Sequence, residues 1–146
     1  MKTVFCLFSI LFFLITSPAF ATPTYIGTVK TAKGSVSVIR DNVQKTANIG
    51  FQVFQNDLIR TGNDGAAGVI FIDNTVLSLG PDTELVMDEY VFAPQKNKLA
   101  MIVRMIKGTA SYLSGIIGKQ SPDNVKFKTP EATIGIRGTK FLVKVD

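Results

Sequence analysis

The 146-residue chain has no histidine and no tryptophan, and its single cysteine is Cys6. Without histidine, and with one cysteine near the N-terminus, the usual ligands for zinc, copper and haem are missing. The same absence removes Ser-His-Asp and Cys-His catalysis. No disulfide can form within the chain, so packing and sheet hydrogen bonds have to stabilise it. We therefore expect no cofactor, no metal and no enzymatic activity.

Long hydrophobic runs are also missing, apart from one near the N-terminus. Lys2 precedes the apolar segment 4–15, and Ala19-Phe20-Ala21 has the small-x-small pattern of a signal-peptidase site. The apolar segment is shorter than the ~20 residues that a membrane-spanning helix needs. We interpret residues 1–21 as a signal peptide and residues 22–146 as one exported domain, periplasmic or secreted, with no membrane span after cleavage. The alternative is an uncleaved membrane anchor.

Charge is distributed unevenly along the expected mature chain. Residues 22–95 hold five basic and eight acidic side chains, a net charge of −3, whereas residues 96–146 hold ten basic and three acidic side chains, a net charge of +7. One interpretation is an ordinary solvated surface. The other is a cationic face for an acidic partner, either a protein or a cell-envelope component. Nucleic acid is not expected, because aromatic residues are not densely interleaved with the basic ones.

Alternation of apolar and polar residues dominates the chain and predicts short β-strands. Segment 47–55 has no clear period and is predicted to be a loop, and the glycines Gly115 and Gly118 argue against a stable helix near Tyr112. We expect a single all-β domain, a β-sandwich or an irregular β-roll. The predicted strands are 25–31, 34–40, 66–73, 75–79, 84–92, 99–106, 125–129, 132–136 and 139–145.

A basic residue, a glycine and a small hydroxyl residue recur three times, with the glycines at Gly34, Gly108 and Gly138. Each triplet precedes an apolar-alternating segment and is interpreted as the beginning of a strand. The glycine fits a bend or a close approach of another strand, and the hydroxyl can bond local backbone. An anion-binding turn is the alternative. Carboxylates follow no pattern that indicates a catalytic pair or a calcium loop.

The segment T-P-E-A-T-I-G-I-R-G-T-K-F at 129–141 resembles the closing signature of the FecR-type periplasmic domain. Weaker similarities lie upstream in the same order, among them N-D-L-I-R-T-G at 56–62, which resembles the middle loop of that family. The resemblance implies a non-enzymatic periplasmic binding, sensing or regulatory module directed at a protein or envelope partner. The alternative is a carbohydrate- or peptidoglycan-binding module. The candidate site residues are Thr129, Pro130, Arg137, Gly138, Thr139 and Phe141.

This chain departs from the three-part organisation of family members that regulate sigma factors, which carry a cytoplasmic helical segment and a membrane span. It begins with an apparent signal and ends after the R-G-T strand, so we expect a stand-alone exported domain. Arg137 has two interpretations, an internal clamp on its own domain or a direct contact with an acidic partner. Phe127 and Phe141 are expected in the core.

Overall fold

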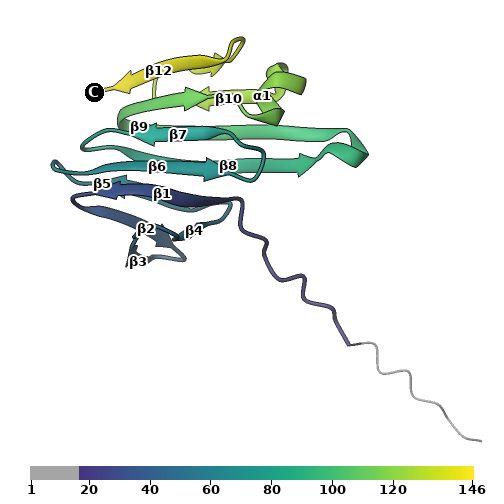
Figure 1. Ribbon diagram of the computed structural model, residues 1–146, viewed down its shortest axis with the longest axis horizontal. Coiled ribbons are helices and arrows are strands. Elements are labelled where there is room, and N and C mark those ends of the chain that lie inside the picture. The colour runs from purple at the N-terminus through teal and green to yellow at the C-terminus, as the bar shows by residue number, and fades with distance from the viewer. Residues whose placement is uncertain (1–16) are drawn as a thin grey trace, which may run out of the picture.

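The computed structural model describes residues 17–146, which form an all-β roll preceded by an exposed N-terminal segment (Figure 1). This confirms the predicted fold class. The expected signal peptide falls mostly on residues 1–16, outside the described part. Within residues 17–146, no helix is both long and apolar enough to cross a bilayer. The strands are β1 (Gly27–Lys33), β2 (Val36–Arg40), β3 (Val43–Thr46), β4 (Gln52–Val53), β5 (Leu58–Thr61), β6 (Ala66–Phe71), β7 (Val76–Leu79), β8 (Glu84–Ala93), β9 (Lys98–Leu113), β10 (Val125–Lys128), β11 (Thr133–Gly135) and β12 (Lys140–Val145).

Helical structure is limited to three short elements among the described residues. They are η1 (Pro94–Lys96), α1 (Ile116–Gln120) and η2 (Pro122–Asn124). The helix α1 contains Gly118, which fits there because a β-carbon at that position would press on the hydroxyls of Tyr112 and Ser114. This limited helix content agrees with the expectation of no stable helix near Tyr112, since Tyr112 belongs to β9 and the helix that follows has only five residues.

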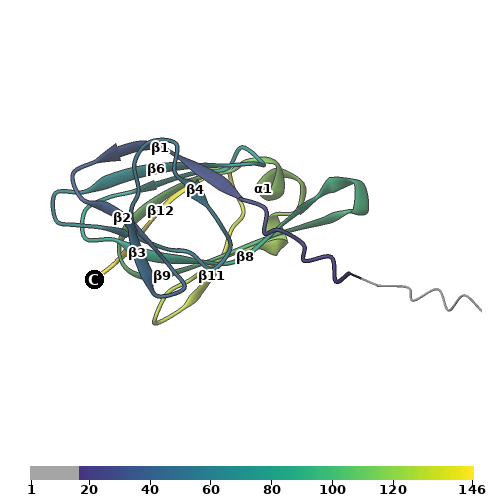
Figure 2. The same cartoon turned by 90° about the horizontal axis from the view of Figure 1, so that it is seen from below.

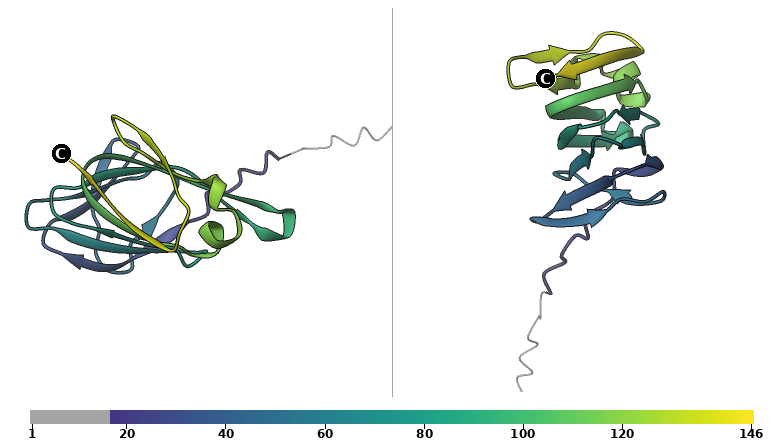
Figure 3. Two further views of the ribbon diagram at one scale, coloured as in Figure 1. Left: turned by 90° about the horizontal axis from the view of Figure 1, so that it is seen from above. Right: turned by 90° about the vertical axis from the view of Figure 1, so that its left-hand side faces the viewer.

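One curled sheet makes up both walls of the roll, in the order β3-β2-β5-β8-β9-β7-β6-β1-β4. The long strand β9 belongs to both walls. Its first half pairs with β8 and, in parallel, with β10, while its second half pairs with β7 and β12. The interior lies between the two walls, as the views along the roll show (Figures 2 and 3). The chain climbs this stack from the end at β3 and β4 to the end at β11 and β12 (Figure 3).

The core is built from the alternate residues of these strands that point between the two walls. In β6 and β9 buried and more exposed residues alternate, as period-two patterning requires. One continuous cluster contains most of the buried apolar side chains, with Phe71, Tyr112 and Phe127 among the largest. With one cysteine, the chain forms no internal disulfide, and a single apolar core that runs the length of the roll stabilises it.

Three strands were not predicted from the sequence, namely β3, β4 and β5. β3 is exposed at all four residues, and β4 has only two residues, so neither carries an alternating pattern. β4 lies inside segment 47–55, which was predicted to be a loop. β5 lies in segment 56–62, which resembles the middle loop of the family, but it pairs with both β2 and β8. Its four residues alternate in burial, yet the run is too short to be distinguished from a loop by periodicity.

The triplet around Gly108 lies in the middle of β9, not at the beginning of a strand, which corrects the prediction. At Gly108 the backbone has a φ of +98°, and a β-carbon would collide with Thr83. This is where β9 passes from one wall to the other. Gly34, in the turn between β1 and β2, is also held at positive φ and lies close to Asp64. Both glycines therefore serve the bend and the close approach expected of them.

Candidate binding surface

All six candidate residues lie in the last turn of the roll, which we call the terminal layer and define as residues 125–146. This layer contains β10, β11 and β12 and closes the end of the stack where the chain finishes (Figure 1). Thr129 and Pro130 lie in the turn between β10 and β11, Arg137 to Thr139 form the connection from β11 to β12, and Phe141 is on β12. The candidates thus share one layer, although they occupy different edges of it.

The Thr129-Pro130 pair closes the β10–β11 hairpin. The Thr129 amide donates to the Ala132 carbonyl at 2.7 Å, and the Ala132 amide donates to Thr129 Oγ1 at 3.1 Å. A threonine hydroxyl that bonds local backbone is a common way to fix such a turn. The structure therefore gives these two residues a folding role, and the hairpin that they close presents β11 at the edge of the roll.

Arg137 reaches an acid of its own domain, as the clamp interpretation expects. Its Nη2 atom is 3.2 Å from Asp123 Oδ1, but the two side chains are 84% and 77% exposed. An ion pair in water contributes at most about 1 kcal/mol to the free energy of unfolding. Arg137 is therefore a weak clamp, and its guanidinium remains accessible to solvent.

Gly138 and Thr139 attach the β11–β12 connection to the end of β9. The Gly138 carbonyl accepts from Ser114 Oγ at 2.9 Å, and the Thr139 carbonyl accepts from the Ser114 amide at 2.8 Å. Gly138 has a φ of +145°, and a β-carbon there would meet no atom within 4 Å. Of the two reasons expected for these glycines, a bend or a close approach of another strand, Gly138 fits only the bend, because it is needed for its backbone conformation.

Phe141 packs in an aromatic cluster with Tyr112 and Phe127. The ring centroids of Phe141 lie 5.0 Å from Tyr112 and 4.9 Å from Phe127. Phe127 is fully buried, whereas Phe141 is half-buried, because it is on the last strand of its wall. Both belong to the core or pack directly against it, as the alternation predicts. The open side of Phe141 faces the end of the roll.

Two adjoining hollows open at that end, between β11 and β12. The first has a volume of about 240 Å³ and is lined by Ile134, Ile136, Phe141 and Val143 among others. The second, of about 270 Å³, is lined by the Thr129-Pro130 turn and again by Ile134 and Val143. Within residues 17–146, no further layer covers the core here. The hollows offer apolar side chains beside a strand edge, together with polar groups that include Glu131 and Asp146 in the second hollow.

Apolar and basic side chains are exposed at several places on the terminal layer. Leu142 is 70% exposed on the outward side of β12, whereas Ile134, 37% exposed, lies opposite the buried Phe127 and lines both hollows. Lys140 lies next to Leu142 on β12, and Lys126 and Lys128 lie on β10. Within residues 17–146, these three lysines form no ion pair, whereas Lys144 is 3.0 Å from Asp146. Part of the basic excess of the C-terminal half thus lies on this surface.

Sequence reasoning did not single out Ile134, Lys140 or Leu142. A signal was present in Lys140-Phe141-Leu142-Val143-Lys144, where a leucine lies between two lysines on the outward phase of a strand. The sequence alone does not show whether the outward side chains of this strand face water or are covered by another part of the chain. The outward side of this wall faces solvent, since Leu113 on the central strand β9 is 45% exposed, and Leu142 on β12 is 70% exposed.

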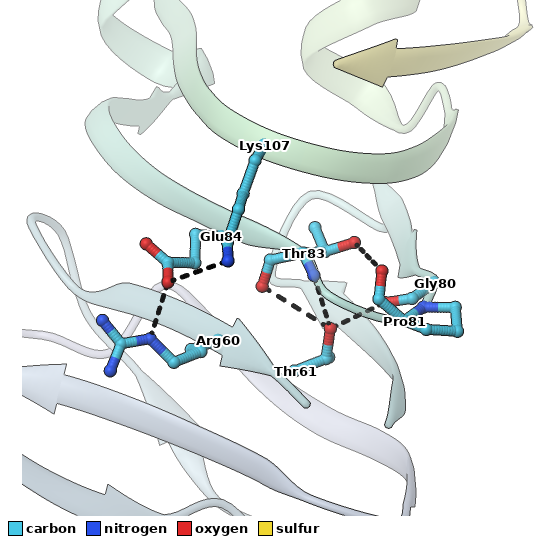
Figure 4. Close-up of polar contacts among 7 residues, drawn as sticks. All are labelled: Arg60, Thr61, Gly80, Pro81, Thr83, Glu84 and Lys107. Carbon is cyan, nitrogen blue, oxygen red and sulfur yellow. Dashed lines mark hydrogen bonds and ion pairs between the residues drawn. The ribbon is translucent and has the colours of Figure 1, made fainter. Parts of the chain in front are cut away.

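The middle of the roll carries a second polar arrangement that sequence reasoning missed. We call it the turn ladder and define it as Thr61, Gly80, Thr83 and Thr109; Figure 4 shows the first three. Thr61 Oγ1 donates to the Gly80 carbonyl at 2.7 Å and accepts from the Thr83 amide at 2.9 Å. Thr83 Oγ1 accepts in turn from the Thr109 amide at 3.0 Å. Each hydroxyl thus ties its own turn to the next, which fixes the register of successive layers.

Ion pairs run beside the turn ladder on the surface of one wall. Glu84 Oε1 lies 2.9 Å from Arg60 Nε and 3.8 Å from Lys107 Nζ (Figure 4). These three residues are cross-strand neighbours on β5, β8 and β9. Both cations are paired with the same carboxylate, so the trio carries a net charge of +1, and its ion pairs link the three strands of the sheet.

Two buried carboxylates are also satisfied internally. Asp57 accepts from Nε and Nη2 of Arg40, both at 2.7 Å, and these hydrogen bonds raise the pKa of Arg40 above its ordinary value. Asp73 accepts from the Tyr90 hydroxyl at 2.8 Å and from the Ile117 amide at 3.0 Å. Burial raises the pKa of Tyr90, so its hydroxyl stays protonated and keeps donating. Neither carboxylate is free to act as a catalyst.

A third hollow, of about 530 Å³, lies near the opposite end of the roll. Its walls include the aromatic side chains of Tyr25, Phe54 and Phe92 together with the amides of Gln55 and Asn56. Tyr25 is 40% exposed. Aromatic rings beside amide groups are the elements of a sugar-binding surface. No cluster of three or more potential metal ligands occurs among residues 17–146.

Comparison with known proteins gives one match. The family model described as FecR protein matches residues 57–146, more than half of the chain, from the beginning of β5 through the terminal layer. No curated protein matches the chain, and no solved structure does so either. The matched region includes the turn ladder and all six candidate residues.

Proposed function

The chain belongs to the FecR family, and from that premise we propose that it is an exported binding module that senses or regulates through a protein or cell-envelope partner in the periplasm or outside the cell. The family is a regulatory one without enzymatic activity. Both buried carboxylates of the roll are engaged in internal hydrogen bonds, which agrees with a role in binding.

The terminal layer is the observation that carries this proposal. It combines exposed aliphatic side chains, lysines without ion-pair partners among residues 17–146, and two hollows with both apolar and polar walls at one end of the core. Exposed apolar patches bordered by polar groups are typical of interaction sites. We place the binding surface there and include Arg137, whose guanidinium is solvent-accessible.

Export is part of the same proposal, with residues 1–21 as a signal peptide and residues 22–146 as the functional domain. Residues 17–25 are exposed and carry no regular secondary structure, and the first buried residue is Ile26. A peptidase could therefore reach the bond after Ala21 without disturbing the roll. Intact-mass measurement of the exported protein tests this. A protein that retained residues 1–21 would contradict it.

Affinity capture from a cell-envelope extract tests the binding role. Immobilised wild-type protein is compared with Leu142→Glu in the terminal layer and with Val43→Glu on β3, where an exposed aliphatic residue lies on the edge strand at the opposite end. A component retained by wild type and by Val43→Glu but lost by Leu142→Glu supports the proposal. Equal retention by all three proteins would contradict the location, and no retained component would contradict the function.

Salt dependence gives a second readout on any captured component. If the lysines of the terminal layer contribute, affinity falls as ionic strength rises from about 0.01 M to about 0.1 M, since the Debye length shrinks from roughly 30 Å to roughly 10 Å. An affinity that did not change would show that apolar burial alone holds the complex.

Carbohydrate or peptidoglycan binding is the second candidate function, favoured by the aromatic hollow near Tyr25. Binding of purified cell-wall fragments to wild type and to Tyr25→Ala tests it. Loss of binding in Tyr25→Ala, with no effect of Leu142→Glu, would move the functional surface to that end of the roll.

A further inference from the structure

β12 has an unoccupied long edge. It pairs with β9 over six consecutive residues, from Lys140 opposite Leu113 to Val145 opposite Gly108. Its other edge has no strand partner within residues 17–146. A strand of this length with free backbone donors and acceptors can accept a further strand.

The two faces of β12 differ sharply in chemistry. Phe141 and Val143 point into the roll, while Lys140, Leu142 and Lys144 point outward. Directly opposite residues in a sheet lie on the same face. A strand added to β12 would therefore turn one set of side chains toward the core and the other toward the two lysines.

The two terminal hollows lie on the inward side of this edge. They share Ile134 and Val143, so they adjoin each other between β11 and β12. Alternate side chains of a strand are about 6.6–6.8 Å apart on one face. Successive inward residues of an added strand could fill successive hollows and bury the open side of Phe141.

We propose that the free edge of β12 binds an extended segment of a partner protein as an additional strand, and that this segment alternates apolar and acidic residues. The inward apolar residues enter the two hollows, and the outward acidic residues face Lys140, which has no ion pair within residues 17–146, and Lys144, where they compete with Asp146. This inference rests on the proposed function and specifies the chemistry of its partner.

A second copy of the chain does not suit this edge. An antiparallel β12–β12 pair that keeps both faces and overlaps fully places Leu142 opposite itself, which puts each Lys140 opposite a Lys144. Like charges directly opposite each other destabilise a sheet, and lysines on edge strands are a known protection against self-association. The same lysines attract an acidic segment.

Three synthetic peptides test the proposal with the full chain, purified from the envelope of expressing cells. The first is an eight-residue peptide of alternating valine and glutamate, and the second replaces glutamate by lysine. The third repeats the first with N-methyl groups on its two central amides, which removes donors on both edges. We expect only the first peptide to bind, with its fluorescence anisotropy rising below about 1 mM, the weak end of specific recognition.

Charge reversal locates the site. Lys140→Glu is expected to weaken binding of the glutamate peptide about five- to tenfold and to favour the lysine peptide, because an attractive cross-strand pair becomes a repulsive one. Lys45→Glu on β3 is the matched control, since Lys45 is an exposed lysine on the edge strand at the other end of the roll. It should leave both affinities unchanged.

Several results would overturn the proposal. No binding of the glutamate peptide below about 1 mM would do so, as would equal binding of the N-methylated peptide, which would exclude strand pairing. Equal weakening by Lys45→Glu and Lys140→Glu would reduce the effect to net charge. If an envelope partner depends on Leu142 in the capture experiment but ignores Lys140→Glu, the proposed function stands and strand addition fails.

Discussion

Replacing Thr61 by valine tests whether the turn ladder holds the layers together. Thr61 is 3% exposed, and its hydroxyl joins the Gly80 carbonyl to the Thr83 amide. Valine has nearly the same shape but removes both hydrogen bonds. Thr83 is fully buried, so no water can replace the lost acceptor for its amide. A buried donor left without a partner costs about 1–3 kcal/mol.

The expected result is a clear loss of stability without a change of fold. With a urea dependence of about 1–3 kcal/mol per molar, a loss of this size lowers the unfolding midpoint by about 1 M and leaves the slope unchanged. Urea unfolding followed by circular dichroism measures it. Thr46→Val on the exposed strand β3 is the control, since its side chain lies in solvent, and it should stay within about 0.5 kcal/mol of wild type.

The most direct test compares the free energies of unfolding of two variants at position 61. Thr61→Ser keeps the hydroxyl and loses one methyl group, which costs about 0.8 kcal/mol for the buried carbon. Thr61→Val keeps the volume and loses the hydrogen bonds. If the ladder stabilises the roll, valine is the more destabilising replacement. A Thr61→Val protein as stable as Thr61→Ser, or more so, would refute the reasoning and reduce Thr61 to a packing residue.

Three further predictions use the same unfolding assay. Arg40→Ala leaves the buried Asp57 carboxylate without its cation and should lower the unfolding free energy by about 3–5 kcal/mol; a loss below about 1 kcal/mol would show that water solvates the carboxylate. Burial raises the pKa of Tyr90, so the free energy of unfolding should stay constant from neutral pH to about pH 10 and then fall, because the unfolded tyrosine ionises there while the folded one keeps its proton. Tyr90→Phe should weaken that fall. A Tyr90→Phe profile identical to that of wild type would contradict the raised pKa of Tyr90 as its cause. Gly108→Ala should lower the free energy of unfolding more than Gly50→Ala does, because both backbones have positive φ but only Gly108 faces a buried turn. Equal losses in the two variants would mean that the close contact with Thr83 contributes nothing beyond the backbone cost of about 1 kcal/mol.

Much of the architecture could be predicted from residue patterns. The strands β6, β7, β8 and β10 and their turns follow from alternating segments separated by punctuating residues, and Asn74 has the positive φ expected of its turn. β3 and β5 could not be predicted this way, because a four-residue strand carries hardly two periods of alternation. The predicted strand 99–106 is shorter than β9, because Gly108 is interpreted from the sequence as the beginning of a new strand. Only the strand pairing on both sides of Gly108 shows that β9 continues through it.

The candidate site was predicted less completely than the fold. The closing segment contains the candidate residues, which all lie in the terminal layer, and their binding role stays a prediction; Phe141 has the core contacts expected from its phase. Arg137 remained open between two roles because an acid fourteen residues away in sequence gives no local signal. Leu142 was also missed for want of a decisive local signal. A leucine on the outward phase of a strand does not show in the sequence whether a neighbouring strand or solvent lies beside it.

The sequence by itself determined the all-β class, the family, the absence of the usual metal and catalytic ligands, and the basic excess of the C-terminal half. The class, the missing ligands and the charge distribution depend on composition and local period, whereas the family follows from the resemblance of segment 129–141 and from the family match over residues 57–146. Only the tertiary structure decided that β9 belongs to both walls, that Thr61 and Thr83 tie successive turns, and that one edge of β12 has no strand partner within residues 17–146. Such properties depend on which distant strands become neighbours, and that pairing is set by the packing of the whole core.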